Sequence, residues 1–151
     1  MLIRPATLED INWSLLDFYQ ENVFFHYQVR PDYFFDGDRE TCKQFLEQQI
    51  KNQTFLLLED DSQKLVGYLY YFFKNEGKKI LWISELFVAP SERRKGYGKY
   101  LINVVKKIAK ENGCVAVELA CRWFNQNALA MYQHIGMKVQ KVIFETDLNE
   151  G

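Results

Sequence analysis

The most informative segment of the chain is residues 83–99, ISELFVAPSERRKGYGK. It begins as an apolar strand candidate, is interrupted at Pro90, and continues through two glycines into a helical pattern. The first N–H groups of a helix lack partners and carry the positive end of the helix dipole, so such a turn suits an anion. Glycine lets the backbone approach a ligand closely, and Arg93, Arg94 and Lys95 add positive charge. The segment therefore predicts a site for a pyrophosphate group.

Two common phosphate motifs differ from this segment in their spacing. A P-loop needs Ser or Thr after its Gly-Lys pair, whereas Tyr100 follows Gly98 and Lys99. A dinucleotide fingerprint needs a third small residue where Leu101 stands, and a βαβ unit that the chain lacks at this point. Taken alone, the segment also fits a plain loop with solvated charges.

The elements predicted on either side of this segment are of both types. Upstream, three strands joined by short turns form an antiparallel meander. Downstream, apolar positions spaced three, four and seven residues apart predict a long helix that Gly113 can end. Residues 22–38 fit neither period. The predicted strands are 2–4, 54–59, 65–74, 79–88, 115–121 and 139–147. A first helix is predicted to start at Thr7, with Asp10 completing a capping box. Three further helices are predicted over residues 39–51, 96–112 and 127–135. This order predicts a mixed α+β sheet with helices on its faces.

Composition is typical of a globular protein of one domain. The 151 residues are 48% hydrophobic and 26% charged, with a net charge of -1. A general nucleic-acid or anionic-membrane binder needs a basic excess, so both classes are disfavoured. Three cysteines, Cys42, Cys114 and Cys121, without a C-x-x-C spacing support neither a disulfide framework nor a zinc site. Neither a secretory pattern nor an apolar run of about 20 residues is visible. We therefore expect one domain over residues 1–151, without a metal and in the cytoplasm.

Three segments resemble those of a known family, the GNAT N-acetyltransferases. The pattern Arg93-x-x-Gly96-x-Gly98, after a strand ending in ELFV, resembles the acyl-CoA signature of that family. Residues 125–137, NQNALAMYQHIGM, resemble its Asn-x-x-Ala-x-x-x-Tyr-x-x-x-Gly-Phe segment, and residues 3–7, IRPAT, are similar to its first strand. The resemblance covers essentially the whole chain. It implies a mixed, mostly antiparallel sheet of six to seven strands flanked by about four helices.

The chain departs from the family pattern at three positions. Glu92 stands where an aromatic residue is frequent, Tyr97 replaces a common aliphatic residue, and Met137 replaces a common Phe. The negative charge of Glu92 lies near the expected phosphate. We therefore expect it to weaken cofactor binding slightly.

The resemblance implies transfer of an acetyl group from acetyl-CoA to an amine, by direct attack in a ternary complex. Glu85 is then the candidate base, although ordered water or a plain salt-bridged Glu85 also fits. On this strand we expect Glu85 to share a face with Ile83 and Phe87, opposite Trp82, Ser84 and Leu86. Tyr132 is the candidate acid for the departing thiolate, and a packed core aromatic is the alternative. The residues implied to hold acetyl-CoA are Phe87 and Val88 at the pantetheine, Arg93, Arg94, Lys95, Gly96, Tyr97, Gly98 and Lys99 at the pyrophosphate, and Asn125, Ala128 and Tyr132.

The acceptor side is expected in the aromatic region after the first helix. In this fold residues 22–38 wall the acceptor pocket together with the middle strands, and here Glu21, Asp32, Asp36 and Asp38 stand around the aromatics. Aromatic rings and carboxylates together suit a cationic amine. Packing of the same aromatics as core is an equal alternative.

Two further segments narrow the acceptor. Residues 67–73 and 81–88 are similar to the spermidine/spermine N-acetyltransferase branch. We therefore expect a small primary amine as acceptor: a polyamine, a diamine or a lysine analogue. A protein N-terminus or lysine, an aminoglycoside, and a non-catalytic acyl-CoA sensor remain alternatives. A homodimer formed through an exposed sheet edge is compatible with the sequence.

Overall fold

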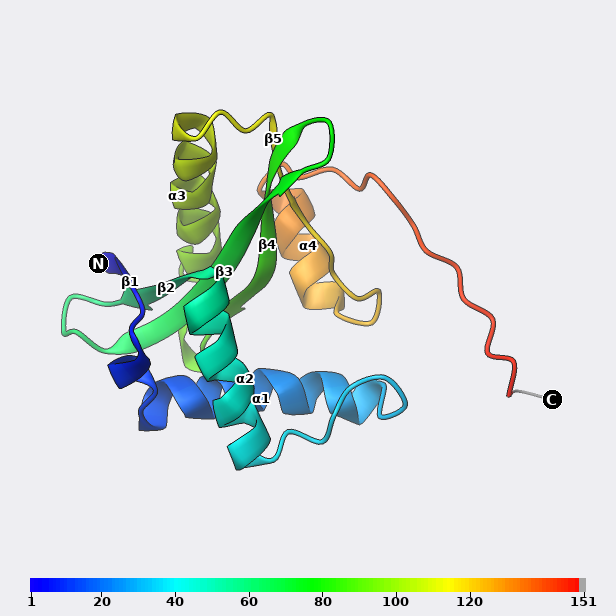
Figure 1. The fold of residues 1–151 in the computed structure, drawn as a ribbon, viewed down its shortest axis with the longest axis horizontal. Helices are drawn as coiled ribbons and strands as arrows, with labels where there is room; N and C mark the ends of the chain where they lie inside the picture. The colour runs from blue at the N-terminus through cyan, green and yellow to red at the C-terminus, as the bar shows by residue number, and fades with distance from the viewer. Residues whose placement is uncertain (150–151) are drawn as a thin grey trace. The chain divides into compact units, whose positions relative to one another are not determined.

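A computed structural model of the protein, which describes residues 1–149, divides into two compact units, Met1–Ala120 and Cys121–Gly151. The first unit holds a five-stranded sheet in the order β1-β2-β3-β4-β5 (Figure 1). Neighbouring strands are antiparallel except β4 and β5, which run parallel. The strands are β1 (Leu2–Pro5), β2 (Thr54–Glu59), β3 (Leu65–Asn75), β4 (Lys79–Val88) and β5 (Ala116–Leu119). The predicted α+β class and the antiparallel meander are confirmed.

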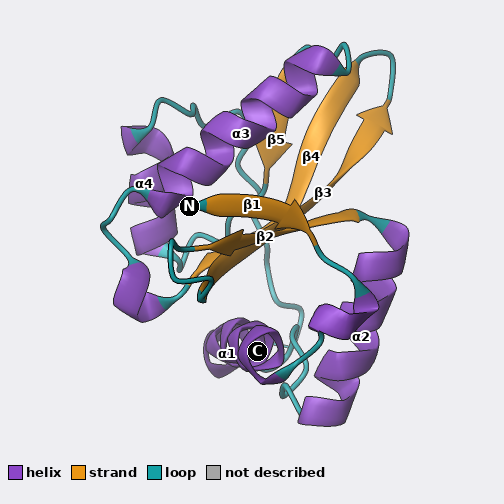
Figure 2. Cartoon of the chain, turned by 90° about the vertical axis from the view of Figure 1, so that its left-hand side faces the viewer, coloured by secondary structure: helices purple, strands orange, loops and turns teal. Residues whose placement is uncertain are grey.

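Helices cover both faces of this sheet (Figure 2). Helices α1 (Trp13–Val29) and α2 (Arg39–Asn52) lie on one side, and α3 (Tyr97–Glu111) lies on the other. Alternate side chains of the strands meet α1 and α2 in one buried cluster, whose members are Leu15, Leu16, Tyr19, Cys42, Leu46, Phe55, Leu57, Tyr68, Tyr70 and Phe87. On α3 the buried apolar side chains recur at Leu101, Ile102, Val105 and Ala109, as the helical period predicts.

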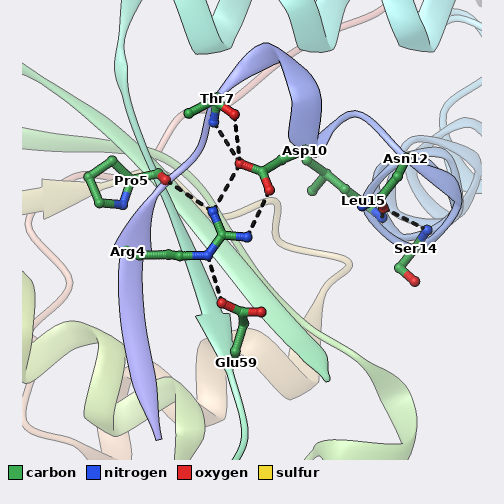
Figure 3. Close-up of polar contacts among 8 residues, drawn as sticks. All are labelled: Arg4, Pro5, Thr7, Asp10, Asn12, Ser14, Leu15 and Glu59. Atoms are coloured by element: carbon green, nitrogen blue, oxygen red, sulfur yellow. Dashed lines mark hydrogen bonds and ion pairs between the residues drawn. The ribbon is translucent and has the colours of Figure 1, made fainter. Parts of the chain in front are cut away.

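The N-terminal end departs from the predicted helix at Thr7. Thr7 precedes only a 3₁₀ turn (Leu8–Asp10), and its N–H donates to Asp10 Oδ2 at 2.7 Å. Arg4 on β1 ties this turn to β2, because its guanidinium donates to both Asp10 and Glu59 at 2.7 Å (Figure 3). The α-helix begins at Trp13 instead, where the Asn12 side chain accepts bonds from two free N–H groups of the first turn.

The first half of the region left unassigned by the sequence is helical, whereas residues 30–38 form turns and loop. Helix α1 continues to Val29, so the run of aromatic residues from Phe24 to Tyr27 lies on its last turns. Apolar side chains occur on all sides of these turns, and Phe24 and Phe25 stay exposed to solvent. The helical period is therefore hidden in the sequence, since only one of these sides faces the sheet.

The second unit contains α4 (Gln126–His134), close to the predicted helix at 127–135. The predicted strand at 139–147 is wrong: these residues form neither helix nor strand, and Ile143 and Phe144 are 79% and 93% exposed. Strand structure needs hydrogen bonds from a neighbouring strand, which apolar sequence alone does not supply. The sheet within residues 1–149 thus has five strands rather than six to seven.

Candidate functional site

The predicted anion site lies where β4 leads into α3. Strand β4 ends at Val88, a 3₁₀ turn follows at Pro90–Glu92, and α3 begins after Gly96. Gly96 has a φ of +84°, a left-handed conformation that glycine adopts at little cost, and no atom lies within 4 Å of where a Cβ would stand. Among the residues that the structure describes, no side chain caps this end of α3. The N–H groups of its first turn therefore suit an anion, as the sequence predicts.

Arg93 is tied to the end of the strand. Its Nε donates to the Val88 carbonyl at 3.0 Å, and its guanidinium carbon lies 5.7 Å from the centre of the Phe87 ring. Arg93, the first residue of the basic turn, therefore contacts both of the strand residues that are expected along the pantetheine, Phe87 and Val88. This contact between Arg93 and Val88 is not apparent from the sequence.

Glu92 forms ion pairs with two lysines, Lys64 and Lys95, of which Lys95 belongs to the basic turn. The Glu92 side chain is buried, and its carboxylate lies 2.9 Å from Lys95 Nζ and 3.5 Å from Lys64 Nζ. The hydrogen bond from Lys95 and the charge of both lysines hold the pKa of the Glu92 carboxyl below its usual range. The charge expected to oppose the phosphate is thus paired, and it fixes Lys95 within the turn.

Glu85 accepts hydrogen bonds from three side chains in the interior of the first unit. Tyr68 and Asn22 donate to Oε1, Tyr68 at 2.5 Å, and Tyr70 donates to Oε2 at 2.6 Å. Burial and the negative charge of Glu85 raise the pKa of the phenols of Tyr68 and Tyr70 well above its ordinary value. Both phenols therefore stay protonated and act as donors.

The face on which Glu85 lies differs from the prediction in one respect. Tyr68 pairs with Phe87 and Tyr70 with Glu85, but Tyr71 pairs with Ile83, so the register skips Ser84. One extra residue reverses the alternation of a strand. Glu85 therefore shares a face with Phe87, as predicted, whereas Ile83 lies on the opposite face.

Most of the carboxylates around the aromatic region line a cavity beside α1. This cavity of about 560 Å³ is lined by Asp17, Gln20, Glu21, Phe24, Tyr27, Asp36, Gly37 and Asp38. Asn22, which contacts Glu85, is two residues from Phe24 and so lies on the other side of the helix. Asp32 is paired with Arg30 instead. From residues 22–38, the contact with Glu85 is therefore made by the side-chain amide of Asn22 and not by one of the carboxylates.

The remaining predicted residues lie in the second unit. Asn125 caps α4, because its Oδ1 accepts a bond from the Ala128 N–H at 3.3 Å. Tyr132 lies on the last turns of α4 and is half-buried, and its carbonyl accepts a bond from Met137 N–H at 3.0 Å. The predicted site residues are thus divided between the two units. The first unit contains Glu85, Phe87, Val88 and residues 93–99, and the second contains Asn125, Ala128 and Tyr132.

Sequence reasoning missed Asn22, Tyr68 and Tyr70 beside Glu85. Two tyrosines at positions i and i+2 of a strand share one face, and this was the only signal for them. It also missed Lys64, the second partner of Glu92. Within residues 1–149 we find no group of three or more His, Cys, Asp or Glu arranged to hold a metal. No helix in that part of the chain is long and apolar enough to span a membrane.

Comparison with known proteins gives matches along most of the chain. The model of the acetyltransferase (GNAT) family matches residues 14–137. The uncharacterised N-acetyltransferase YhfO of Bacillus subtilis is 28% identical over 113 residues, covering 72% of this chain and 76% of that protein. The thialysine N-epsilon-acetyltransferase of Bos taurus is 32% identical over 74 residues, covering 48% of this chain and 44% of the bovine protein. A crystal structure of a BH1408 protein tetramutant from Bacillus halodurans has the same fold, with a TM-score of 0.88 and 24% identity over 98% of this chain and 100% of that one.

Proposed function

This chain belongs to the acetyltransferase (GNAT) family and is an acetyl-CoA-dependent acyltransferase, and we propose that its acceptor is a small cationic primary amine. The acceptor class we favour is a polyamine, a diamine or a lysine analogue. The reaction is a direct attack of the amine on acetyl-CoA while both are bound. GNAT proteins use acetyl-CoA as co-substrate, so the proposal concerns which residues of this chain hold each partner.

The observation that carries the proposal is the surroundings of Glu85. This half-buried carboxylate has three partners among residues 1–149, and all three are neutral. A carboxylate without a cationic partner keeps its attraction for an incoming ammonium group. Glu85 also lies two residues before Phe87, on the strand expected to run along the pantetheine. It is therefore well placed to take a protonated amine next to the thioester.

The proposed acetyl-CoA site follows β4 into the basic turn. Backbone groups of Phe87 and Val88 would pair with the pantetheine as an added strand does, once Arg93 releases the Val88 carbonyl. The uncapped first turn of α3 supports pyrophosphate binding by backbone N–H groups, with the residues of the turn around it. In the second unit Asn125 and Ala128 would meet the pantetheine arm. The residues proposed at the pyrophosphate are Arg93, Arg94, Lys95, Gly96, Tyr97, Gly98 and Lys99.

The proposed chemistry assigns one proton transfer to each side of the reaction. An amine with a pKa of about 10.4 is almost wholly protonated at pH 7, so forming the free base costs about 4.6 kcal/mol. Glu85, directly or through water, takes that proton. The amine nitrogen then bonds to the thioester carbon and the carbon–sulfur bond breaks. Tyr132 gives its phenol proton to the departing thiolate, which leaves as the thiol of CoA.

The test is acetyl-CoA-dependent thiol release with a panel of amines. The panel contains spermidine, thialysine, an aminoglycoside and a short peptide with a free N-terminus. We expect the highest kcat/KM with spermidine or thialysine, and a loss of about tenfold or more in Glu85→Gln. Glu47→Gln, a half-buried glutamate of α2, serves as the matched control and should keep the wild-type rate.

Two results would contradict the proposal. A highest rate with the peptide or the aminoglycoside would replace the small amine by that acceptor class. A blank across the whole panel, with acetyl-CoA still bound, would point to a specific protein acceptor.

A further inference from the structure

Glu85 is held from two different elements of the first unit. Tyr68 and Tyr70 reach it from β3, and Asn22 reaches it from α1, 63 residues away in the chain. Tyr70 is the direct cross-strand partner of Glu85, and Tyr68 stands two residues earlier on the same face. The skipped Ser84 turns Glu85 toward α1, since without it the carboxylate would lie on the α3 side.

The donors themselves have little freedom to move. Tyr68 is fully buried and Tyr70 nearly so. The Phe55 ring stacks on Tyr70 with centroids 4.8 Å apart and planes 12° from parallel, and it lies 5.4 Å from the Tyr68 ring. Side chains packed in this way keep a single rotamer, so the phenol oxygens are fixed in space. The positions of the phenols in turn fix the plane of the carboxylate.

We propose that Asn22, Tyr68 and Tyr70 are positioning residues that clamp the Glu85 carboxylate for the acceptor amine. This inference rests on the proposed role of Glu85. A carboxylate offers about four acceptor positions, and the clamp uses two on Oε1 and one on Oε2. The remaining capacity is on Oε2, the oxygen that accepts from Tyr70. The acceptor ammonium, or the water that carries its proton, therefore binds Glu85 through Oε2.

The clamp has a test that needs no acceptor. Unfolding free energies are measured for Glu85→Ala, for Tyr70→Phe and for the double variant, with Tyr71→Phe in place of Tyr70→Phe as the matched control. Tyr71 is the next residue on β3, is equally buried, and pairs with Ile83 on the other face. We expect non-additive losses for Glu85 with Tyr70 and additive losses for Glu85 with Tyr71. The same cycle with Tyr68→Phe is the second measurement, and additive losses for both tyrosines would overturn the clamp.

The function of the clamp is tested by measuring the KM for the amine and the KM for acetyl-CoA separately in each variant. With spermidine and thialysine as amines, Tyr68→Phe, Tyr70→Phe and Asn22→Ala should each raise the KM for the amine about tenfold. The KM for acetyl-CoA should stay within about twofold, since a hydrogen bond to Glu85 does not hold the cofactor. Tyr71→Phe should change neither constant.

The outcomes separate this inference from the proposed function. A rise of both constants together would mean that the tyrosines only support the sheet, and would overturn the positioning role. The positioning role would also be overturned if the clamp variants kept the wild-type KM values while Glu85→Gln lost most of its kcat/KM. That result would leave the proposed function standing. Full activity in Glu85→Gln would reject the role of Glu85 and with it the use of the clamp. If neither amine is acetylated, the unfolding cycles decide whether the clamp exists.

Discussion

Gly67 on β3 occupies a position that no larger residue fits without moving β4. A Cβ at Gly67 would lie 2.6 Å from the backbone oxygen of Phe87, and the strand residue opposite is Val88. Ordinary contact begins at 3.4 Å, so Gly67→Ala must displace β4 by most of about 0.8 Å. Overpacking of this kind costs about 1–3 kcal/mol of unfolding free energy. In a chain of this length that lowers Tm by about 2–12 °C.

The same displacement reaches the proposed pantetheine site. The carbonyl of Val88, the residue after Phe87, accepts from Arg93 and is expected at the pantetheine. Weakening of one backbone hydrogen bond there should raise the Kd for acetyl-CoA about 2- to 10-fold, measured by calorimetry. The control is Val66→Ala, the preceding residue, which is fully buried. It removes two methyl groups at a cost of about 1–3 kcal/mol but leaves the Phe87 carbonyl in place.

Two results would refute this reasoning. One is a Gly67→Ala variant whose unfolding free energy lies within about 0.5 kcal/mol of the wild type. The other is an equal change in Kd for Gly67→Ala and Val66→Ala, which would show that general loosening, not the position of β4, affects binding.

Three further predictions follow from other parts of the molecule. Tyr132→Phe should lower the transfer rate about tenfold or more with the Kd for acetyl-CoA nearly unchanged, and an unchanged rate would remove Tyr132 from the mechanism. Gly96→Ala forces an alanine into a left-handed conformation at a cost of about 1–2 kcal/mol, so thermal unfolding should show a lower Tm, and calorimetry should show weaker acetyl-CoA binding. The hydrogen bond from Arg4 holds the pKa of the Asp10 carboxyl below its ordinary value, so its contribution to stability is present above the unfolded pKa near 4 and is lost as pH falls through the lower folded pKa. Asp10→Asn should therefore flatten the decline of Tm below about pH 5, and an unchanged decline would show that this pair does not contribute.

The basic turn could be predicted because all of its parts are neighbours in the chain. The strand end, Pro90, Gly96 and the start of α3 span fewer than twenty residues, and each has a local conformational preference. The sequence also predicted that Glu85 and Phe87 share a face, since the skipped residue lies before both of them.

Other features depended on packing that no short pattern encodes. Helix α1 runs to Val29 although its aromatic turns show no helical period, because one side meets the sheet and the other sides remain exposed. Residues 139–147 have the composition of a strand, yet they form none in the described chain. An apolar run becomes a strand only where a partner strand meets it in register.

The sequence by itself determined the family, the strand–turn–helix at the proposed anion site and the identity of Glu85 as a candidate. These features depend on residue types at fixed, short spacings in the chain, and such spacings do not depend on how the rest of the chain packs. Only the tertiary structure decided how Glu85 is held. Its contacts with Asn22, 63 residues away, and with Tyr68 and Tyr70 require the register of β3 on β4, the skipped Ser84 and the seating of α1 on the sheet. Each of these is set by the whole core at once, because a shift of one residue in a strand would turn the carboxylate to the other face.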